Sequence, residues 1–215
     1  MVKEGVPYLM TILAFFLLAS VALLTFGWSP LLPVAALLIL LGAGLMIFFR
    51  DPRRSVPKGE GLIVSPADGR IVEVSEAVDA DHGTALRKIG IFLSLWDVHV
   101  NRCPMTGRVE EVEHRAGRFT PAFRSKASHS NEQMHIRLST EAGTVRMTQI
   151  AGSLARRIIC RLRPGDQVTR GERFGMILFG SRVEVYLPVG VTVRVSVGDR
   201  LKGGESIIGA FQHHV

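Results

Sequence analysis

Two long apolar segments open the chain and differ from everything that follows. No Asp, Glu, Lys or Arg occurs from residue 5 to residue 49. The segments 8–26 and 31–49 each approach the ~20 residues that a helix needs to cross a hydrocarbon core of ~30 Å. Gly27-Trp28-Ser29-Pro30 separates them. We predict a helical hairpin in the membrane within residues 1–50, in preference to a cleaved signal peptide or a hairpin lying in the interface.

Short apolar runs separated by turn residues follow a Pro-, Gly- and Arg-rich linker at residues 51–61. Runs of this length and spacing are typical of strands. The predicted elements are two strands joined by an Asp68-Gly69 turn within 62–74, a longer strand at 88–102, a strand at 108–113 and a hairpin at 134–150 around Glu141-Ala-Gly143. The one candidate helix beyond the linker is a short stretch near 152–157. We therefore expect residues 62–215 to form a mostly β domain.

An internal repeat lies near the end of the chain. Pro164-Gly-Asp-Gln-Val-Thr-Arg-Gly-Glu172 and Val197-Gly-Asp-Arg-Leu-Lys-Gly-Gly-Glu205 share the pattern Gly-Asp-x-(Val/Leu)-x-x-Gly-Glu, offset by 33 residues. Paired turn units of this kind flank the central hairpin of lipoyl- and biotinyl-type domains. We predict a pseudo-symmetric barrel-sandwich with residue 181 near its middle. A carrier domain of this type needs an exposed lysine at the hairpin tip, and no lysine lies between the two units.

The segment between the two repeats alternates as a strand does. Ser181, Val183 and Val185 share one parity, which we expect to face inward, while Arg182 and Glu184 share the other. The serine hydroxyl is therefore expected on the apolar face. Gly180, which precedes it, has no Cβ and so permits a strained backbone and close approach to its carbonyl group. By itself, a Gly-Ser pair is more typical of a bulge and a buried, hydrogen-bonded serine.

Charge gives the hairpin a predicted orientation and the domain a predicted partner. Four basic residues follow the second apolar segment within residues 50–58, whereas Lys3 and Glu4 cancel before the first. The positive-inside rule therefore puts the β domain on the cytoplasmic side of the cell membrane. The formal net charge of +7 favours anionic lipid headgroups, each Lys or Arg near the surface contributing about 1 kcal/mol. Nucleic acid is not expected, since no basic cluster interleaved with aromatic residues is present.

Polar residues also interrupt the predicted strand at 88–102. Strand alternation would put Asp97, His99 and Asn101 on one face of an otherwise apolar segment. In isolation this arrangement is more typical of a core histidine with a hydrogen-bonded acceptor than of a site. The two cysteines, Cys103 and Cys160, have no metal-ligand spacing, and we expect reduced thiols and no metal site.

Together, several short motifs resemble those of the phosphatidylserine decarboxylase family in its short form. They occur in order over almost the whole domain after residue 50. The motifs are Pro66-Ala-Asp-Gly69, Leu93-Ser-Leu-Trp-Asp-Val-His99, Asn131-Glu132, Gln149-Ile-Ala-Gly152 followed by Ala155-Arg-Arg-Ile158, and Arg170-Gly-Glu-Arg-Phe-Gly-Met-Ile177 leading into Phe179-Gly-Ser-Arg-Val-Glu-Val-Tyr-Leu-Pro188. Five ordered motifs make this resemblance far more specific than the Gly-Ser pair alone.

The resemblance implies that the chain cuts itself between Gly180 and Ser181. Ser181 would become a covalent pyruvoyl group, and a large chain of residues 1–180 would stay associated with a small chain of residues 181–215. A Schiff base between the pyruvoyl group and the amine of phosphatidylserine would then lose CO₂ and give phosphatidylethanolamine. His99 is the expected proton donor, because histidine ordinarily has a pKa of ~6.5. Asp68 and Asp97 match positions that act in self-cleavage.

One departure leaves the base of self-cleavage open. Many members of the family carry a second histidine three residues after the first, where this chain has Arg102. Arginine is not a base at neutral pH, so the base role falls to His99, Asp68 or Asp97. We expect Arg102, His114 and Lys126 to bind the substrate.

Two rival functions remain at this point. The same chemistry can act on another serine-headgroup lipid, such as an ether-linked one. A non-catalytic, membrane-anchored adaptor with a lipoyl-like domain would instead remain a single uncut chain. The oligomeric state beyond the two associated chains is left open by the sequence.

Overall fold

The chain forms two compact units, residues 1–52 and residues 53–215, which are described separately. The structure is a computed structural model. It describes residues 2–26, 31–79, 83–118, 130–152, 157–178 and 180–211.

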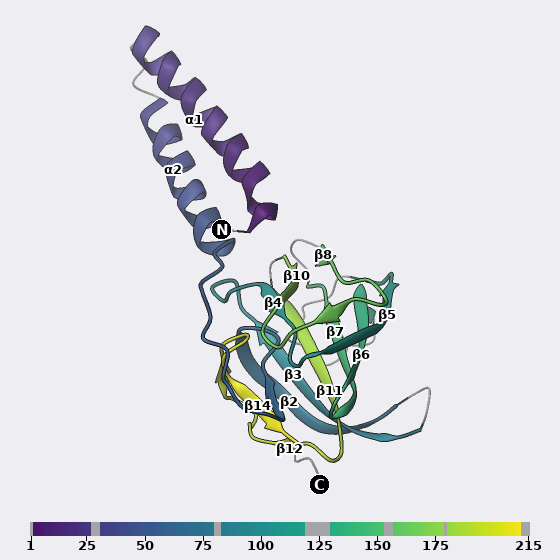
Figure 1. Cartoon of the computed structure of the whole chain (residues 1–215). Helices are drawn as coiled ribbons and strands as arrows, with labels where there is room; N and C mark the ends of the chain where they lie inside the picture. Colours follow the sequence, from purple (N-terminus) through teal and green to yellow (C-terminus); the bar gives the residue numbers. More distant parts are fainter. Residues whose placement is uncertain are drawn as a thin grey trace. The chain divides into compact units, whose positions relative to one another are not determined.

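The first unit is a pair of apolar helices. A short 3₁₀ helix (Lys3–Gly5) leads into α1 (Val6–Phe26), and α2 (Leu31–Phe48) packs beside it (Figure 1). Phe49 stacks on Tyr8 with ring centroids 5.8 Å apart. Most large apolar side chains point outward, for example Leu24, which is 85% exposed. Both helices are long and apolar enough to cross a membrane, so the predicted helices are present.

The second unit is built on a curled antiparallel sheet (Figure 1). In the described part of the chain this sheet has eight strands in the order β13-β2-β3-β11-β7-β6-β5-β9. The strands are β2 (Gly69–Val78), β3 (Ala85–Leu93), β5 (Gly107–Arg115), β6 (Gln133–Thr140), β7 (Gly143–Ile150), β9 (Gln167–Val168), β11 (Ser181–Pro188) and β13 (Arg200–Leu201). β11 is therefore a central strand, between β3 and β7.

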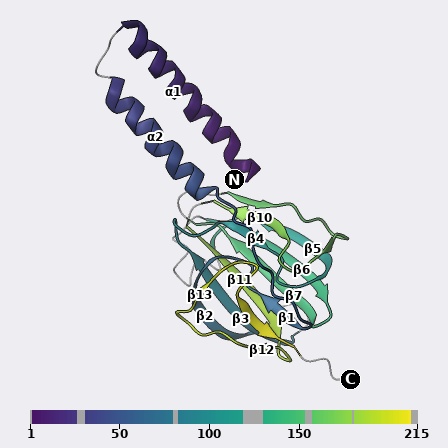
Figure 2. The ribbon, with the colours of Figure 1, turned by 60° about the vertical axis from the view of Figure 1, so that its left-hand side comes forward.

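Two three-stranded sheets complete the unit and lie toward opposite ends of it (Figure 2). One has the order β1-β14-β12 and the other β4-β10-β8. Their strands are β1 (Leu62–Val64), β4 (Val100–Arg102), β8 (Ile158–Cys160), β10 (Arg173–Ile177), β12 (Thr192–Val193) and β14 (Ile207–Ala210). The predicted mostly β, barrel-sandwich class, preceded by two apolar helices, is confirmed.

The sequence repeat corresponds to a structural repeat. Its first copy carries β9 and leads into β10, and its second carries β13 and leads into β14. β9 and β13 occupy the two outer edges of the eight-stranded sheet. Gly165 and Gly198, at the same position of each copy, have φ values of 97° and 101°, a region that favours glycine. The two halves of the domain are thus built from equivalent turns on either side of β11.

The core lies on one face of β11. Val183, Val185 and Leu187 are fully buried and pack with Ile91, Leu93 and other apolar residues of β2 and β3. Burial of each such side chain contributes roughly 1.5–3 kcal/mol. The predicted inward parity of the Ser181 strand is confirmed.

The prediction of one strand over residues 88–102 is wrong. The segment divides into β3, which ends at Leu93, and β4, which begins at Val100, with a turn between them. The Asp97 carboxylate accepts hydrogen bonds from the backbone N–H and the hydroxyl of Ser94, at 2.8 and 2.6 Å. A short polar side chain that bonds local backbone in this way competes with strand pairing.

The predictions for residues 134–150 and 62–74 agree with the structure more closely. β6 and β7 form the predicted hairpin, with Thr140 opposite Gly143 at its turn. Residues 62–74 contain two strands as predicted, although these pair with β14 and with β3 and β13 rather than with each other. Most of the candidate helix near 152–157 falls outside the described residues.

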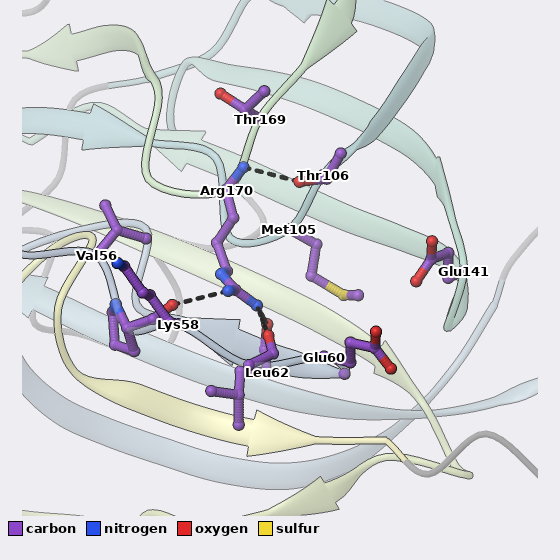
Figure 3. A pocket seen from close by; sticks show the side chains of 12 residues that line it. Val56, Lys58, Glu60, Leu62, Met105, Thr106, Glu141, Thr169 and Arg170 are labelled. Atoms are coloured by element: carbon purple, nitrogen blue, oxygen red, sulfur yellow. Dashed lines mark hydrogen bonds between the residues drawn. The ribbon is translucent and has the colours of Figure 1, made fainter.

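The linker is held against the β domain by arginine side chains. The guanidinium of Arg170 donates to the carbonyl oxygens of Pro57, Gly59 and Leu62 at 2.7, 2.9 and 3.0 Å (Figure 3). A cleft of about 440 Å³ lies beside these contacts, and Met105 contributes to its lining. None of the predicted site residues that the structure describes lines this cleft, which is formed largely by the linker.

Candidate active site

Ser181 is the first residue of β11 and is completely buried. Its Oγ has no hydrogen-bond partner within the part of the chain that the structure describes. Gly180, which precedes it, is partly exposed and has a φ of 58°, in the left-handed region. A buried hydroxyl without a partner costs about 1–3 kcal/mol, and such groups in folded proteins call for an explanation.

Residues 93–99 are joined at one end to Ser181 and at the other end to Ile177. Ser181 pairs with Leu93, and the backbone N–H of Ile177 donates to the carbonyl oxygen of His99 at 3.3 Å. The Ser94–Asp97 turn therefore lies next to the Gly180-Ser181 bond. Leu95 and Trp96 project from this turn and are 45% and 77% exposed.

His99 is completely buried beside this turn. Its Nδ1 lies 2.9 Å from the carbonyl oxygen of Asp97. A carbonyl oxygen only accepts hydrogen bonds, so Nδ1 must carry a proton. In the neutral ring Nε2 then has the lone pair and can take up a proton.

Two fully buried amides lie near the same position. Gln149 of β7 donates to Asn101 of β4 at 2.7 Å, and both side chains are completely buried. Gln149 pairs with Val183, so its side chain projects from the same face of the sheet as Ser181. Asn101 Nδ2 and Gln149 Oε1 have no hydrogen-bond partner among the described residues. The pair therefore has one donor and one acceptor that are buried and not used by the residues the structure describes.

Asp68 lies at the same end of the sheet, across β3 from Ser181. Arg70 pairs with Phe92, which in turn pairs with Arg182, so the starts of β2 and β11 flank the end of β3. The Asp68 carboxylate is bound by Arg54 Nη2 at 2.9 and 2.8 Å and by the backbone N–H of Gly203 at 2.7 Å. These contacts join the linker to the second repeat copy.

The structure describes two of the three predicted substrate-binding residues. Arg102 is buried, and its Nη1 donates to the carbonyl oxygen of Gly171 at 3.0 Å. His114 is half exposed and lies 2.9 Å from Glu132 Oε1. Lys126 lies outside the described residues. The substrate role of these three remains a prediction.

The cysteines are free, as expected. Burial, followed by the charges of Glu172 and Cys160, raises the pKa of Cys103 to about 12. Such a thiol stays protonated near neutral pH and is not a nucleophile. Among the residues described, no group of three or more His, Cys, Asp or Glu side chains could hold a metal ion.

Sequence inspection overlooked two features of the site. Gln149 was recognised within a motif but not as a site residue, although it is the one amide at the inward parity of Val145 and Met147. The opposite parity of β11 was expected to be polar, and it is also buried: Arg182 is 2% and Glu184 1% exposed. Their partners come from strands far away in the sequence, which no local pattern reveals.

Comparison with known proteins gives one family. The family model described as phosphatidylserine decarboxylase matches residues 41–209. A phosphatidylserine decarboxylase proenzyme of Syntrophus aciditrophicus is 44% identical, the alignment covering 97% of this chain and 96% of the relative. Proteins of the same name from Nitratidesulfovibrio vulgaris and Zymomonas mobilis are 43% and 46% identical, over 89% and 75% of this chain and 88% and 70% of the relatives.

Proposed function

The chain belongs to the phosphatidylserine decarboxylase family, and we propose that it acts through a pyruvoyl group that it makes from its own Ser181. The reaction of the family converts phosphatidylserine to phosphatidylethanolamine, so the chain is a lyase. The name proenzyme, which the relatives carry, supports activation by cleavage.

One observation carries the proposal: Ser181 Oγ is completely buried, has no partner in the described structure and adjoins Gly180 in a left-handed backbone conformation. A structural serine at this depth would normally be hydrogen-bonded. A nucleophile that attacks the preceding carbonyl group needs a free lone pair and a backbone that deviates from the extended strand. Both conditions hold here.

Self-cleavage follows from residues of the chain alone. Ser181 Oγ loses its proton to a base and bonds to the Gly180 carbonyl carbon, while the Gly180-Ser181 C–N bond breaks and the freed amine takes up the proton. Loss of the Ser181 Cα proton and of the Gly180 carboxylate then leaves a dehydroalanine residue. Water converts this residue to a ketone and releases ammonia. Nε2 of His99 is the base that best suits these steps, because Nδ1 is committed to Asp97.

The surroundings of Ser181 fit the product of this chemistry. Oγ departs with Gly180, so the processed residue no longer carries the buried hydroxyl that lacks a partner. Gly180 is partly exposed, which allows the new carboxylate to reach water. When formed, the pyruvoyl carbonyl supplies an electrophile for the substrate amine and takes up the electron pair left behind by CO₂.

The neighbouring side chains have distinct roles in this proposal. His99 returns a proton to the substrate carbon after CO₂ leaves. The Asn101–Gln149 pair offers an N–H donor and a carbonyl acceptor to the serine headgroup. Asp97 holds the turn and orients the His99 ring through its carbonyl oxygen, and Asp68 fixes the start of β2 through Arg54 and Gly203. Both aspartates are therefore positioning residues.

The substrate is a membrane lipid, which explains two apolar features. The helices α1 and α2 would keep the enzyme in the membrane, with the β domain on the cytoplasmic side. The exposed Leu95 and Trp96 adjoin the buried site, and tryptophan favours the interface between lipid and water. We assign this turn to contact with the bilayer at the point where the headgroup enters.

The experiment compares wild type with Ser181→Ala and with Ser139→Ala, an exposed serine of β6, as the matched control. Intact mass and denaturing gels follow cleavage, and release of CO₂ from phosphatidylserine in mixed micelles follows activity. Wild type and Ser139→Ala should give two chains, the smaller starting at residue 181 and blocked to Edman sequencing. Ser181→Ala should stay whole and inactive.

An uncut, inactive wild type would overturn the proposal and favour a non-catalytic adaptor. Cleavage without activity on phosphatidylserine, but with activity on an ether-linked serine lipid, would keep the chemistry and change the substrate.

A further inference from the structure

The outer face of β11 carries a network of four charges, of which Arg182 and Glu184 are buried and Glu73 and Lys88 are partly buried. Arg182 Nη2 donates to Glu73 of β2, and Arg182 Nε lies 2.9 Å from Glu184 Oε1, a charge contact without hydrogen-bond geometry. Lys88 Nζ of β3 lies 3.0 Å from Glu184 and 3.2 Å from Glu73. Tyr186 donates to the second oxygen of Glu184 at 2.7 Å. Two cations and two anions thus balance within the sheet.

Gly90 provides the space that this network needs. It lies on β3 directly opposite Glu184. A Cβ at Gly90 would lie 2.5 Å from Arg182 Nη2 and 3.2 Å from the Cβ of Glu73. The guanidinium group therefore occupies a slot that exists because residue 90 has no side chain.

The charge environment favours the ionised form of Glu73. Burial alone would raise the pKa of Glu73, but the hydroxyl of Ser75, followed by Lys88 and Arg182, outweighs it, and the pKa of Glu73 lies below its ordinary value. Ser75 donates to the remaining Glu73 oxygen at 2.9 Å. Each member of the network is thus held by at least two partners.

The position of the network relative to Ser181 gives it a function. Arg182 is bonded directly to Ser181, and its partners Glu73 and Lys88 stand on β2 and β3, which would belong to the large chain after cleavage. A shift of β11 by one residue would move Arg182 to the apolar core face. The network therefore sets the register that puts Ser181 opposite Leu93.

We propose that Arg182 is a positioning residue, which through Glu73 and the Gly90 slot holds residue 181 in place for self-cleavage and for decarboxylation. This inference rests on the proposed function of Ser181. It adds a residue that touches neither the substrate nor the reacting bond. After cleavage the same ion pairs tie the first residues of the small chain to the large one.

The test measures self-cleavage of the full chain after synthesis in the presence of lipid nanodiscs, as the fraction of cut chain over time. The variants are Arg182→Met, Glu73→Gln, both together, and Gly90→Ala, which narrows the slot and leaves every charge in place. Arg87→Met is the matched control, because Arg87 of β3 pairs with Glu76 of β2 in the same sheet but both side chains are exposed. Circular dichroism and thermal unfolding report whether each variant is folded.

We expect cleavage of folded Arg182→Met to slow by roughly 10- to 100-fold, since small misplacements of reacting atoms have effects of that size. Glu73→Gln and Gly90→Ala should also slow cleavage. The double variant should be cut no more slowly than Arg182→Met. Arg87→Met should match wild type. Among molecules that are cut, kcat should fall while KM for phosphatidylserine stays unchanged.

Cleavage of folded Arg182→Met and Gly90→Ala at the wild-type rate would overturn the inference, whatever the thermal stability of these variants. If Arg182→Met does not fold, the cleavage rate of folded Gly90→Ala tests the inference by itself. A wild-type chain that is never cut would instead refute the proposed function, so the two failures are distinguishable.

Discussion

Replacement of Gln149 by leucine tests whether the buried amide pair serves the reaction or only the fold. Gln149 and Asn101 are both completely buried and joined by one hydrogen bond of 2.7 Å. Leucine approximates the volume of glutamine but leaves the Asn101 side chain with no hydrogen-bond partner among the described residues. A buried polar group that loses its partner costs about 1–3 kcal/mol. For a domain of this size, each kcal/mol lowers Tm by about 2–4 °C.

We therefore expect Gln149→Leu to lower Tm by roughly 2–12 °C. The measurement uses the Ser181→Ala background, in which the chain should remain whole, and follows unfolding by circular dichroism in detergent. Gln167→Leu is the matched control, because Gln167 is exposed on β9 of the same sheet and should leave Tm unchanged.

The double variant Asn101→Leu with Gln149→Leu separates fold from function. Removal of both partners leaves no orphaned amide, so much of the lost stability should return, and the two changes should not be additive. In the chain that keeps Ser181, however, the double variant should still have low decarboxylase activity, because the donor and acceptor that we propose for the headgroup are removed. Additive losses of Tm, or full activity in the double variant, would refute this reasoning.

Two further predictions concern pH and the membrane. Burial, moderated by nearby charges of both signs, lowers the pKa of His135 below 6.5, so the unfolded chain takes up a proton before the folded one. Stability should therefore fall as pH falls from about 6.5, and His135→Gln, measured by Tm against pH in the uncut Ser181→Ala chain, should flatten this dependence. Trp96→Ala should raise KM for phosphatidylserine in vesicles and leave activity on a soluble short-chain analogue unchanged; an equal loss on both substrates would argue against bilayer contact.

The parity of β11 and the repeat could be predicted from the sequence because each depends on local patterns. Alternation along the strand put Ser181 with Val183 and Val185 on the inward face, and all three are buried. The glycines at positions 165 and 198 recur because both turns need the same positive φ. Such features require no knowledge of which strands pair.

The turn after β3 and the buried charges could not be predicted for two different reasons. The Ser94–Asp97 turn depends on one side chain that bonds its own backbone, inside an apolar run whose composition favours a strand. The ion pair between Glu73 and Arg182 joins residues 109 positions apart. In sequence, Arg182 and Glu184 resemble a solvated strand face, and only the order β2-β3-β11 explains their burial.

The place of Ser181 at the start of a central strand would reconcile the proposed self-cleavage with a stable domain. A cut between Gly180 and Ser181 would leave β11 paired with β3 from Ser181 to Pro188 and with β7 from Arg182 to Tyr186. The remainder of the small chain adds β13 to the edge of β2 and β14 to β1. The cut would therefore remove one peptide bond. It would leave in place the described pairings between strands of the large chain and strands of the small chain. The same bond, placed in the middle of β11, would have divided the core strand itself.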